Sequence, residues 1–132
     1  MSLSLRVFPL LPGKELDFHR FCEELAGPRA EQARDFFERF GVVRETWMLQ
    51  HTATSSQIAV CSQVEQRLLE RAADYGASQH EFDQWFKCQI ESLSGIDVNQ
   101  APLGPPTELA FDWNRGRFTT RASALHPEIA DG

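Results

Sequence analysis

The segment RETWMLQHT, residues 44–52, holds the residue types closest to chemistry in this chain. Glu45, Trp47 and His51 occupy alternate positions, so in a β-strand they share one face. A carboxylate and an imidazole can act as acid and base, but such partners must approach within ~3 Å. With a rise of ~3.3 Å per residue, Glu45 and His51 lie roughly 20 Å apart along a strand. They cannot form a dyad, and a site that uses either needs side chains from another element.

The carboxylate of Glu45 lies on an otherwise apolar strand face, where burial of a charge is costly unless another group compensates it. Three interpretations are open. We favour a structural ion pair with Arg29, which would fix the register of a helix against the sheet. Glu45 could instead line a ligand pocket and act on a ligand proton, or it could face solvent.

Trp47 and His51 each have two interpretations. Aromatic residues dominate the burial of small cores, so Trp47 is more typical of a core or dimer-interface anchor than of a ligand-stacking site. His51 lies beside a polar turn, which is typical of an exposed histidine at the end of a strand. If a pocket exists, Glu45, Trp47 and His51 are its candidate residues. The mixed pattern of strand 42–52 leaves open which of its faces lines a cleft.

The elements that would position these residues follow the order strand, helix, strand, strand, helix, strand. Hydrophobic spacing and turn residues place strands at 5–11, 42–52, 56–62 and 109–114, with helical segments between 15 and 41 and between about 63 and 95. This order is that of the ferredoxin-like split βαβ motif. We therefore predict an α+β fold with a four-stranded antiparallel sheet, helices on one face, and a domain that covers 1–114. Residues 115–132 are predicted to be an irregular or partly disordered C-terminal tail.

Local signals within the second helical half assign ordinary roles to its polar residues. Ser62 followed by Glu65 has capping-box spacing, as does Ser78 followed by Glu81, which predicts helices that start near 63 and 79. The apolar stripe of the helix after residue 79 leaves Lys87 for solvent. Asp83 falls in the first turn of this helix, where a carboxylate favours the helix dipole.

Composition excludes several function classes. The chain of 132 residues has a formal net charge of -6, and its basic residues are scattered, so we expect no nucleic-acid partner. No apolar run approaches the ~20 residues that span a bilayer. The N-terminus lacks the pattern of a secretory signal, so we expect no membrane association and a cytoplasmic location.

The cysteines and the short motifs point away from metal and cofactor chemistry. Cys22, Cys61 and Cys88 are odd in number and far apart, which is typical of free core cysteines rather than of disulfides or zinc ligands. The chain contains no phosphate-binding glycine loop, H-E-x-x-H or G-x-S-x-G motif. We expect no metal and no cofactor.

Five segments of the sequence carry a family resemblance: ELAGPR (24–29), RETWMLQ (44–50), FDQWFK (82–87), SGID (94–97) and GPPTELAFDW (104–113). In these the chain resembles small bacterial proteins of unknown function in the dimeric α/β-barrel superfamily, over about residues 6–113. That superfamily includes antibiotic-biosynthesis-type monooxygenases, haem-degrading enzymes and stress-responsive barrel proteins. The resemblance implies a homodimer whose sheets face each other. It also implies a cleft, within the barrel or between sheet and helices, where some members bind aromatic or haem-like ligands.

Two functions therefore stay open, and the sequence does not decide whether the protein is an enzyme. In the first, a homodimer binds a small apolar or aromatic molecule in its cleft, as a binding protein or as a cofactor-independent monooxygenase. In the second, the barrel is filled and the protein is a non-catalytic structural or protein-interaction module. A cavity of several hundred Å³ with converging polar groups would favour the first function. A filled barrel with Glu45 paired to Arg29 would favour the second.

Overall fold

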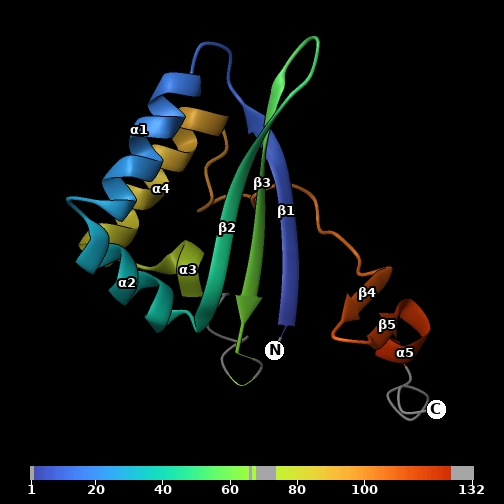
Figure 1. Ribbon diagram of the computed structural model, residues 1–132. Helices are drawn as coiled ribbons and strands as arrows, with labels where there is room; N and C mark the ends of the chain where they lie inside the picture. The colour runs from blue at the N-terminus through green and yellow to red at the C-terminus, as the bar shows by residue number, and fades with distance from the viewer. Residues whose placement is uncertain (1, 66, 68–73, 126–132) are drawn as a thin grey trace.

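The computed structural model describes residues 2–65, 67 and 74–125, which form an α+β fold (Figure 1). Its elements, in chain order, are β1 (Ser2–Leu10), α1 (Glu15–Ala26), α2 (Ala30–Arg39), β2 (Val42–His51), β3 (Ser56–Val64), α3 (Asp74–Ala77), α4 (Glu81–Ser94), β4 (Phe111–Asn114), β5 (Arg117–Thr120) and α5 (Arg121–Leu125). In the described ranges, no helix is long and apolar enough to cross a membrane.

The main sheet is antiparallel, with the order β1-β3-β2, so that β3 is its central strand. Helices α1, α2 and α4 lie on one side of this sheet (Figure 1). The antiparallel sheet and the one-sided helices fit the predicted ferredoxin-like class. The core between these layers is apolar and rich in aromatic side chains: Phe8, Leu10, Phe18, Phe21, Ala33, Phe36, Ile58, Val60, Phe82, Phe86, Ile90 and Leu93.

The predicted fourth strand of this sheet is not confirmed, because in the described residues the sheet has three strands. Strand β4, which the prediction assigned to that place, pairs with β5 in a separate hairpin that projects from the rest of the chain (Figure 1). Arg115 and Gly116 both have positive φ angles, 54° and 82°, as a tight hairpin turn requires. The chain therefore turns back directly after β4, and β4 pairs with β5 instead of with β1.

The two helix starts predicted from capping-box spacing have different outcomes. Helix α4 begins at Glu81, close to the predicted residue 79, and it ends at the left-handed Gly95, as the glycine predicted. The predicted start near 63 is wrong, because β3 continues to Val64. Pairing of β3 with two neighbouring strands outweighs the local capping signal. Most of the remaining segment, residues 66 and 68–73, lies outside the described residues.

The predicted C-terminal tail contains regular secondary structure, and one of the three cysteines is exposed. Within the predicted tail 115–132, the structure describes residues 115–125, which include β5 and the short helix α5, whereas 126–132 lie outside the described residues. Cys22 and Cys61 are half-buried, but Cys88 is exposed, so the prediction of a core position is wrong for Cys88.

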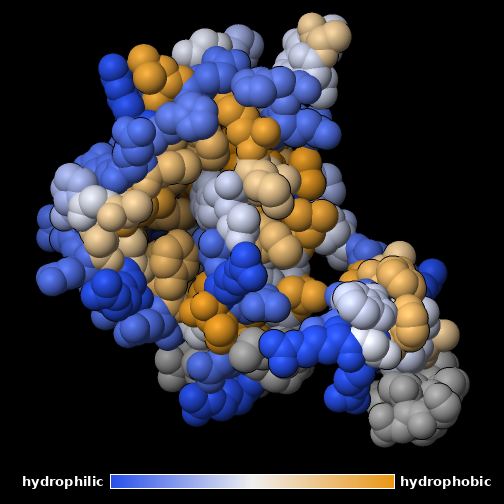
Figure 2. All heavy atoms as spheres, viewed as in Figure 1, coloured by the Kyte–Doolittle hydropathy of each residue, from blue (hydrophilic) through white to orange (hydrophobic). Residues whose placement is uncertain are grey.

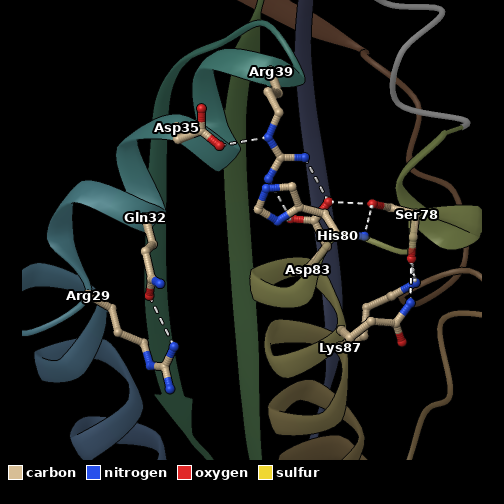
Figure 3. A network of polar contacts seen from close by, with 9 residues as sticks. Arg29, Gln32, Asp35, Arg39, Ser78, His80, Asp83 and Lys87 are labelled. Atoms are coloured by element: carbon tan, nitrogen blue, oxygen red, sulfur yellow. Dashed lines mark hydrogen bonds and ion pairs between the residues drawn. The ribbon is translucent and has the colours of Figure 1, made fainter.

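A polar network joins α2 to the start of α4 (Figure 3). The guanidinium of Arg39 donates two hydrogen bonds to the carboxylate of Asp83, with N–O distances of 2.8 and 2.6 Å. Ser78 donates a third, at 2.6 Å. Asp83 has no exposed surface. Burial alone would raise the pKa of Asp83, but the hydrogen bonds from Arg39 and Ser78 outweigh it and hold the pKa below its usual range.

One turn further along α4, the ammonium group of Lys87 is buried, with only 3% of the residue exposed. Its Nζ donates to the carbonyl oxygens of Gly76 and Ser78, both at 3.0 Å, and to Oδ1 of Asn99 at 2.9 Å. The prediction that Lys87 faces solvent is therefore wrong. Lys87 instead ties the segment around α3 and the loop after α4 to one helix.

The Asp83→Ala substitution should lower the free energy of unfolding by about 3 kcal/mol, because it leaves the guanidinium of Arg39 without its buried partner. The matched control is Asp35→Ala, which removes the exposed carboxylate that also accepts from Arg39 at 2.8 Å. This control should cost less than about 1 kcal/mol, as exposed pairs do. Urea unfolding measures both, and equal losses would contradict the structural role of Asp83.

Candidate ligand-binding cleft

A cleft of about 600 Å³ lies between the helix-facing side of the sheet, helices α2 and α4, and the segment 98–103. Its walls are largely aromatic and aliphatic. The aromatic lining consists of Phe36, Phe37, Phe40, Trp47, Tyr75 and Phe86. A volume of this size is typical of small-molecule sites with mostly apolar walls.

The strand register decides which residues of β2 reach this cleft. Glu45 pairs with Ser62 of β3, and Trp47 pairs with Val60, so these four side chains share the helix-facing side of the sheet. The ring of Trp47 packs edge-on against Phe8 and Phe86, with centroid separations of 6.2 and 6.0 Å. The face of strand 42–52 that carries Glu45 is therefore the face that lines the cleft, a point that the sequence left open.

Glu45 is the acidic residue of the cleft wall, and its carboxylate is held in place by two neighbours. Nε1 of Trp47 donates to Oε2 at 2.9 Å, and the hydroxyl of Ser62 donates to Oε1 at 2.8 Å. Burial raises the pKa of the Glu45 carboxyl, and these two hydrogen bonds offset only part of that increase. Such a carboxyl is a stronger base than an exposed one, and it retains a proton to higher pH than an exposed glutamate does.

Tyr75, in α3, contributes a second buried polar group to the same cleft. Its hydroxyl oxygen is buried and has no hydrogen-bond partner within the described part of the chain. Burial, together with the negative charges of Glu45 and Asp83, raises the pKa of the Tyr75 hydroxyl well above its usual range. This hydroxyl therefore stays protonated and is available as a donor.

The predicted ion pair between Arg29 and Glu45 does not occur. In the described residues, Nε of Arg29 donates to Glu24 at 3.0 Å, and its guanidinium lies 4.0 Å from the ring centroid of Trp85. Arg29 lies between α1 and α2, three residues after the end of α1, so a partner on that helix is reached without crossing to the sheet. Glu45 instead receives its hydrogen bonds from Trp47 and Ser62.

Of the three residues predicted to line a pocket, Glu45 and Trp47 line the cleft, whereas His51 lies outside its lining. His51 is exposed at the end of β2, and its Nδ1 lies 3.0 Å from the hydroxyl of Ser56. The structure therefore brings together two of the three pocket candidates.

Sequence reasoning missed six polar residues of the cleft lining: Ser4, Arg6, Ser62, Tyr75, Asn99 and Gln100. Ser62 was interpreted as a helix cap, whereas its hydroxyl binds Glu45 across the β2–β3 ladder. Tyr75 carried one usable signal, since it is the single tyrosine of the chain. No three His, Cys, Asp or Glu side chains converge in the described ranges as a metal site would require.

The raised pKa of Glu45 predicts a pH trend in stability. The unfolded chain loses this proton near the usual pKa of 4.5, before the folded protein does. The contribution of Glu45 to the free energy of unfolding therefore decreases as the pH rises above 4.5 towards the folded-state pKa. Glu45→Gln should be less stable than the parent by about 1 kcal/mol at pH 4, because an amide cannot accept both hydrogen bonds. This deficit should shrink or reverse by pH 7.

Urea unfolding at several pH values checks this trend. The quantity to compare is the difference in free energy of unfolding between Glu45→Gln and the parent protein. The absolute pH dependence is not sufficient, because the pKa of Asp83 is lowered and its contribution stabilises the fold at pH values above its usual pKa. Glu31→Gln, on an exposed position of α2, is the control for a carboxylate outside the cleft. A deficit that is constant between pH 4 and pH 7 would contradict a buried, proton-retaining Glu45.

Comparisons with known proteins identify a shared fold and no family. The chain matches no protein-family model and no curated protein. Among solved structures it is similar to the crystal structure of L-rhamnose mutarotase FA22100 from Formosa agariphila, with a TM-score of 0.60. The match covers 86% of this chain and 100% of that chain, at 12% sequence identity. At this level of identity the similarity concerns the fold.

Proposed function

We propose that this protein is a homodimer that binds a small, largely apolar or aromatic molecule in the cleft beside Glu45. The observation that carries the proposal is the cleft itself, about 600 Å³ in volume, with aromatic walls and a half-buried carboxyl whose pKa is raised. A filled core with Glu45 paired to Arg29 was the expectation for a structural module. The open volume and the separate partners of these two residues favour the binding function.

The reaction that such a cleft would support is proton transfer to and from Glu45. Apolar walls exclude water and keep the carboxyl basic, which suits removal of a weakly acidic ligand proton. A cofactor-independent monooxygenase is the enzymatic form of this proposal. In that form, Glu45 would take a proton from a substrate CH₂ group, and the resulting carbanion would reduce dioxygen and form a C–O bond, giving a hydroperoxide once protonated. Loss of water from this hydroperoxide, with cleavage of its O–O bond and loss of the second C–H proton, would leave a carbonyl, so that the substrate supplies all the electrons (R₂CH₂ + O₂ → R₂C=O + H₂O).

The similar solved structure supports one part of this proposal, a small-molecule site on this fold. It is named as a mutarotase of L-rhamnose, a small molecule, and it shares the fold of this chain. We carry over from it only the proposal of a small-molecule site on this fold. The aromatic lining beside Glu45 is the reason to expect a ligand with a larger apolar surface than a sugar.

The proposed homodimer would cover the sheet face that points away from the helices. On this face the register places Leu5 beside Cys61 and aligns Val7, Ala59 and Met48 across all three strands. Leu5 is 40% exposed and Met48 is 56% exposed. Figure 2 shows apolar side chains on the strands and also on the projecting hairpin. Exposed apolar patches of this kind are typical of interaction surfaces, and a second sheet is the natural cover.

Binding in the cleft can be tested with naphthalene as the probe. The NMR signals of cleft residues should shift saturably with naphthalene. Val42→Trp, which adds bulk to the cleft wall, should weaken the binding by about tenfold or more. Val43→Trp is the matched control, since the adjacent valine is exposed and outside the lining. Absence of saturable binding to the parent protein, or equal effects of both variants, would contradict the binding function.

The homodimer can be tested by native mass spectrometry and light scattering. The parent protein should have the mass of two chains, and Leu5→Glu should shift it to one chain, because the dimer would bury two added carboxylates. Leu16→Glu is the matched control, since Leu16 is exposed on α1 at the opposite side of the sheet. A monomeric parent protein would contradict the proposal. An adduct that is lost on denaturation would also give the mass of a natural ligand.

A further inference from the structure

The cleft contains a buried hydrogen-bond donor that the described chain does not use. The hydroxyl of Tyr75 is buried in an otherwise apolar environment, and no acceptor in the described residues contacts it. A buried polar group without a partner costs free energy, so native proteins rarely keep one without a reason. Because this group borders an open volume, an atom of a bound ligand is the partner that would satisfy it.

Tyr75 is held in its position rather than free to turn away. The carbonyl of the next residue, Gly76, accepts a hydrogen bond from the buried ammonium of Lys87. The ring of Tyr75 packs against Phe36, Phe40 and Phe86, with centroid separations of 5.7, 5.9 and 6.1 Å. The hydroxyl is therefore a preorganised donor, which lowers the entropic cost of binding a ligand.

Glu45 supplies the complementary acceptor. Each carboxylate oxygen of Glu45 accepts one hydrogen bond within the chain, Oε2 from Trp47 and Oε1 from Ser62. A carboxylate oxygen has two lone pairs, so both oxygens keep capacity for a ligand donor. Glu45 and Tyr75 line the same cleft, and the negative charge of Glu45 contributes to the raised pKa of the Tyr75 hydroxyl.

We propose that the ligand carries a hydroxyl group that accepts a hydrogen bond from Tyr75 and donates one to Glu45. This inference rests on the proposed binding function and specifies the ligand class: a phenol, enol or alcohol on an apolar body. A ketone or ether oxygen would satisfy Tyr75 alone, because it has no proton for Glu45. An ionised carboxylate ligand has no proton to donate to Glu45, so it too would satisfy only the Tyr75 hydroxyl.

Three probes of nearly equal shape separate these possibilities. Naphthalene has no polar group, 1-methoxynaphthalene has only an acceptor, and 1-naphthol has both an acceptor and a donor. Calorimetric titration at pH 7 should show that 1-naphthol binds the parent protein at least about tenfold more tightly than either analogue. The order of the three affinities shows whether the ligand hydroxyl contributes to binding. The affinity for naphthalene shows whether the cleft binds an apolar molecule at all.

Two substitutions then assign the donor and the acceptor. Tyr75→Phe should weaken 1-naphthol binding by about five- to tenfold and leave naphthalene binding unchanged. Its melting temperature should not decrease, since the substitution removes a buried hydroxyl that has no partner in the described residues. Glu45→Gln should reduce the preference for 1-naphthol over 1-methoxynaphthalene by a similar factor. Loss of that preference in both variants supports the inference.

The possible failures are distinguishable from one another. If all three probes bind with equal affinity, the cleft exists but the hydroxyl inference is wrong. If 1-naphthol is preferred and Tyr75→Phe keeps the full preference, the assignment of Tyr75 is wrong. If no probe binds to the parent protein, the binding function fails, and the inference that rests on it fails with it.

Discussion

The structure depends on two charged groups buried one turn apart on α4. Asp83 has no exposed surface and Lys87 has only 3%, so each must have its hydrogen bonds supplied by the protein. Asp83 obtains them from Arg39 of α2 and from Ser78, and Lys87 obtains them from Gly76, Ser78 and Asn99. These bonds fix a second helix, the segment around α3 and the loop after α4 relative to one helix. These segments form the walls of the cleft that face the sheet.

This arrangement explains how a small domain can keep an open volume. Aromatic packing alone tends to close a cavity, because unfilled space loses both dispersion contacts and buried area. Here the hydrogen bonds of Asp83 and Lys87 set the distance between α4, α3 and the loop after α4. The rings of Phe36 and Phe86, which line the cleft, have a centroid separation of 4.8 Å. Glu45 and Tyr75, two of the polar residues of the wall, border a volume that the described chain does not fill.

The two faces of the sheet form different surfaces. The helix-facing side packs against the core and, at one end, forms the cleft with the half-buried carboxyl of Glu45. The opposite side carries a strip of leucine, valine, alanine and methionine that the described part of the chain leaves half-covered. Since β-strands alternate their side chains, each strand contributes to both surfaces at adjacent residues. A homodimer would therefore bury one surface without closing the other.

Local pattern in the sequence was sufficient for the fold class, the helix α4 with its glycine end, and the placement of Glu45 and Trp47 on a common strand face. Such features depend on neighbours within a few residues, and alternation or helical spacing records them directly. The partner of Glu45, the burial of Lys87, the end of β3 and the separate β4–β5 hairpin were decided by contacts between residues distant in sequence. Ser62 is an example. Its spacing to Glu65 matches a helix cap, but β3 pairs with β1 and β2, and in this position the Ser62 hydroxyl donates a hydrogen bond to Glu45. The sequence by itself determined the fold class and the elements with a strong hydrophobic period. The tertiary structure decided which polar groups meet, because a buried polar group depends on the partner that the packing brings within reach.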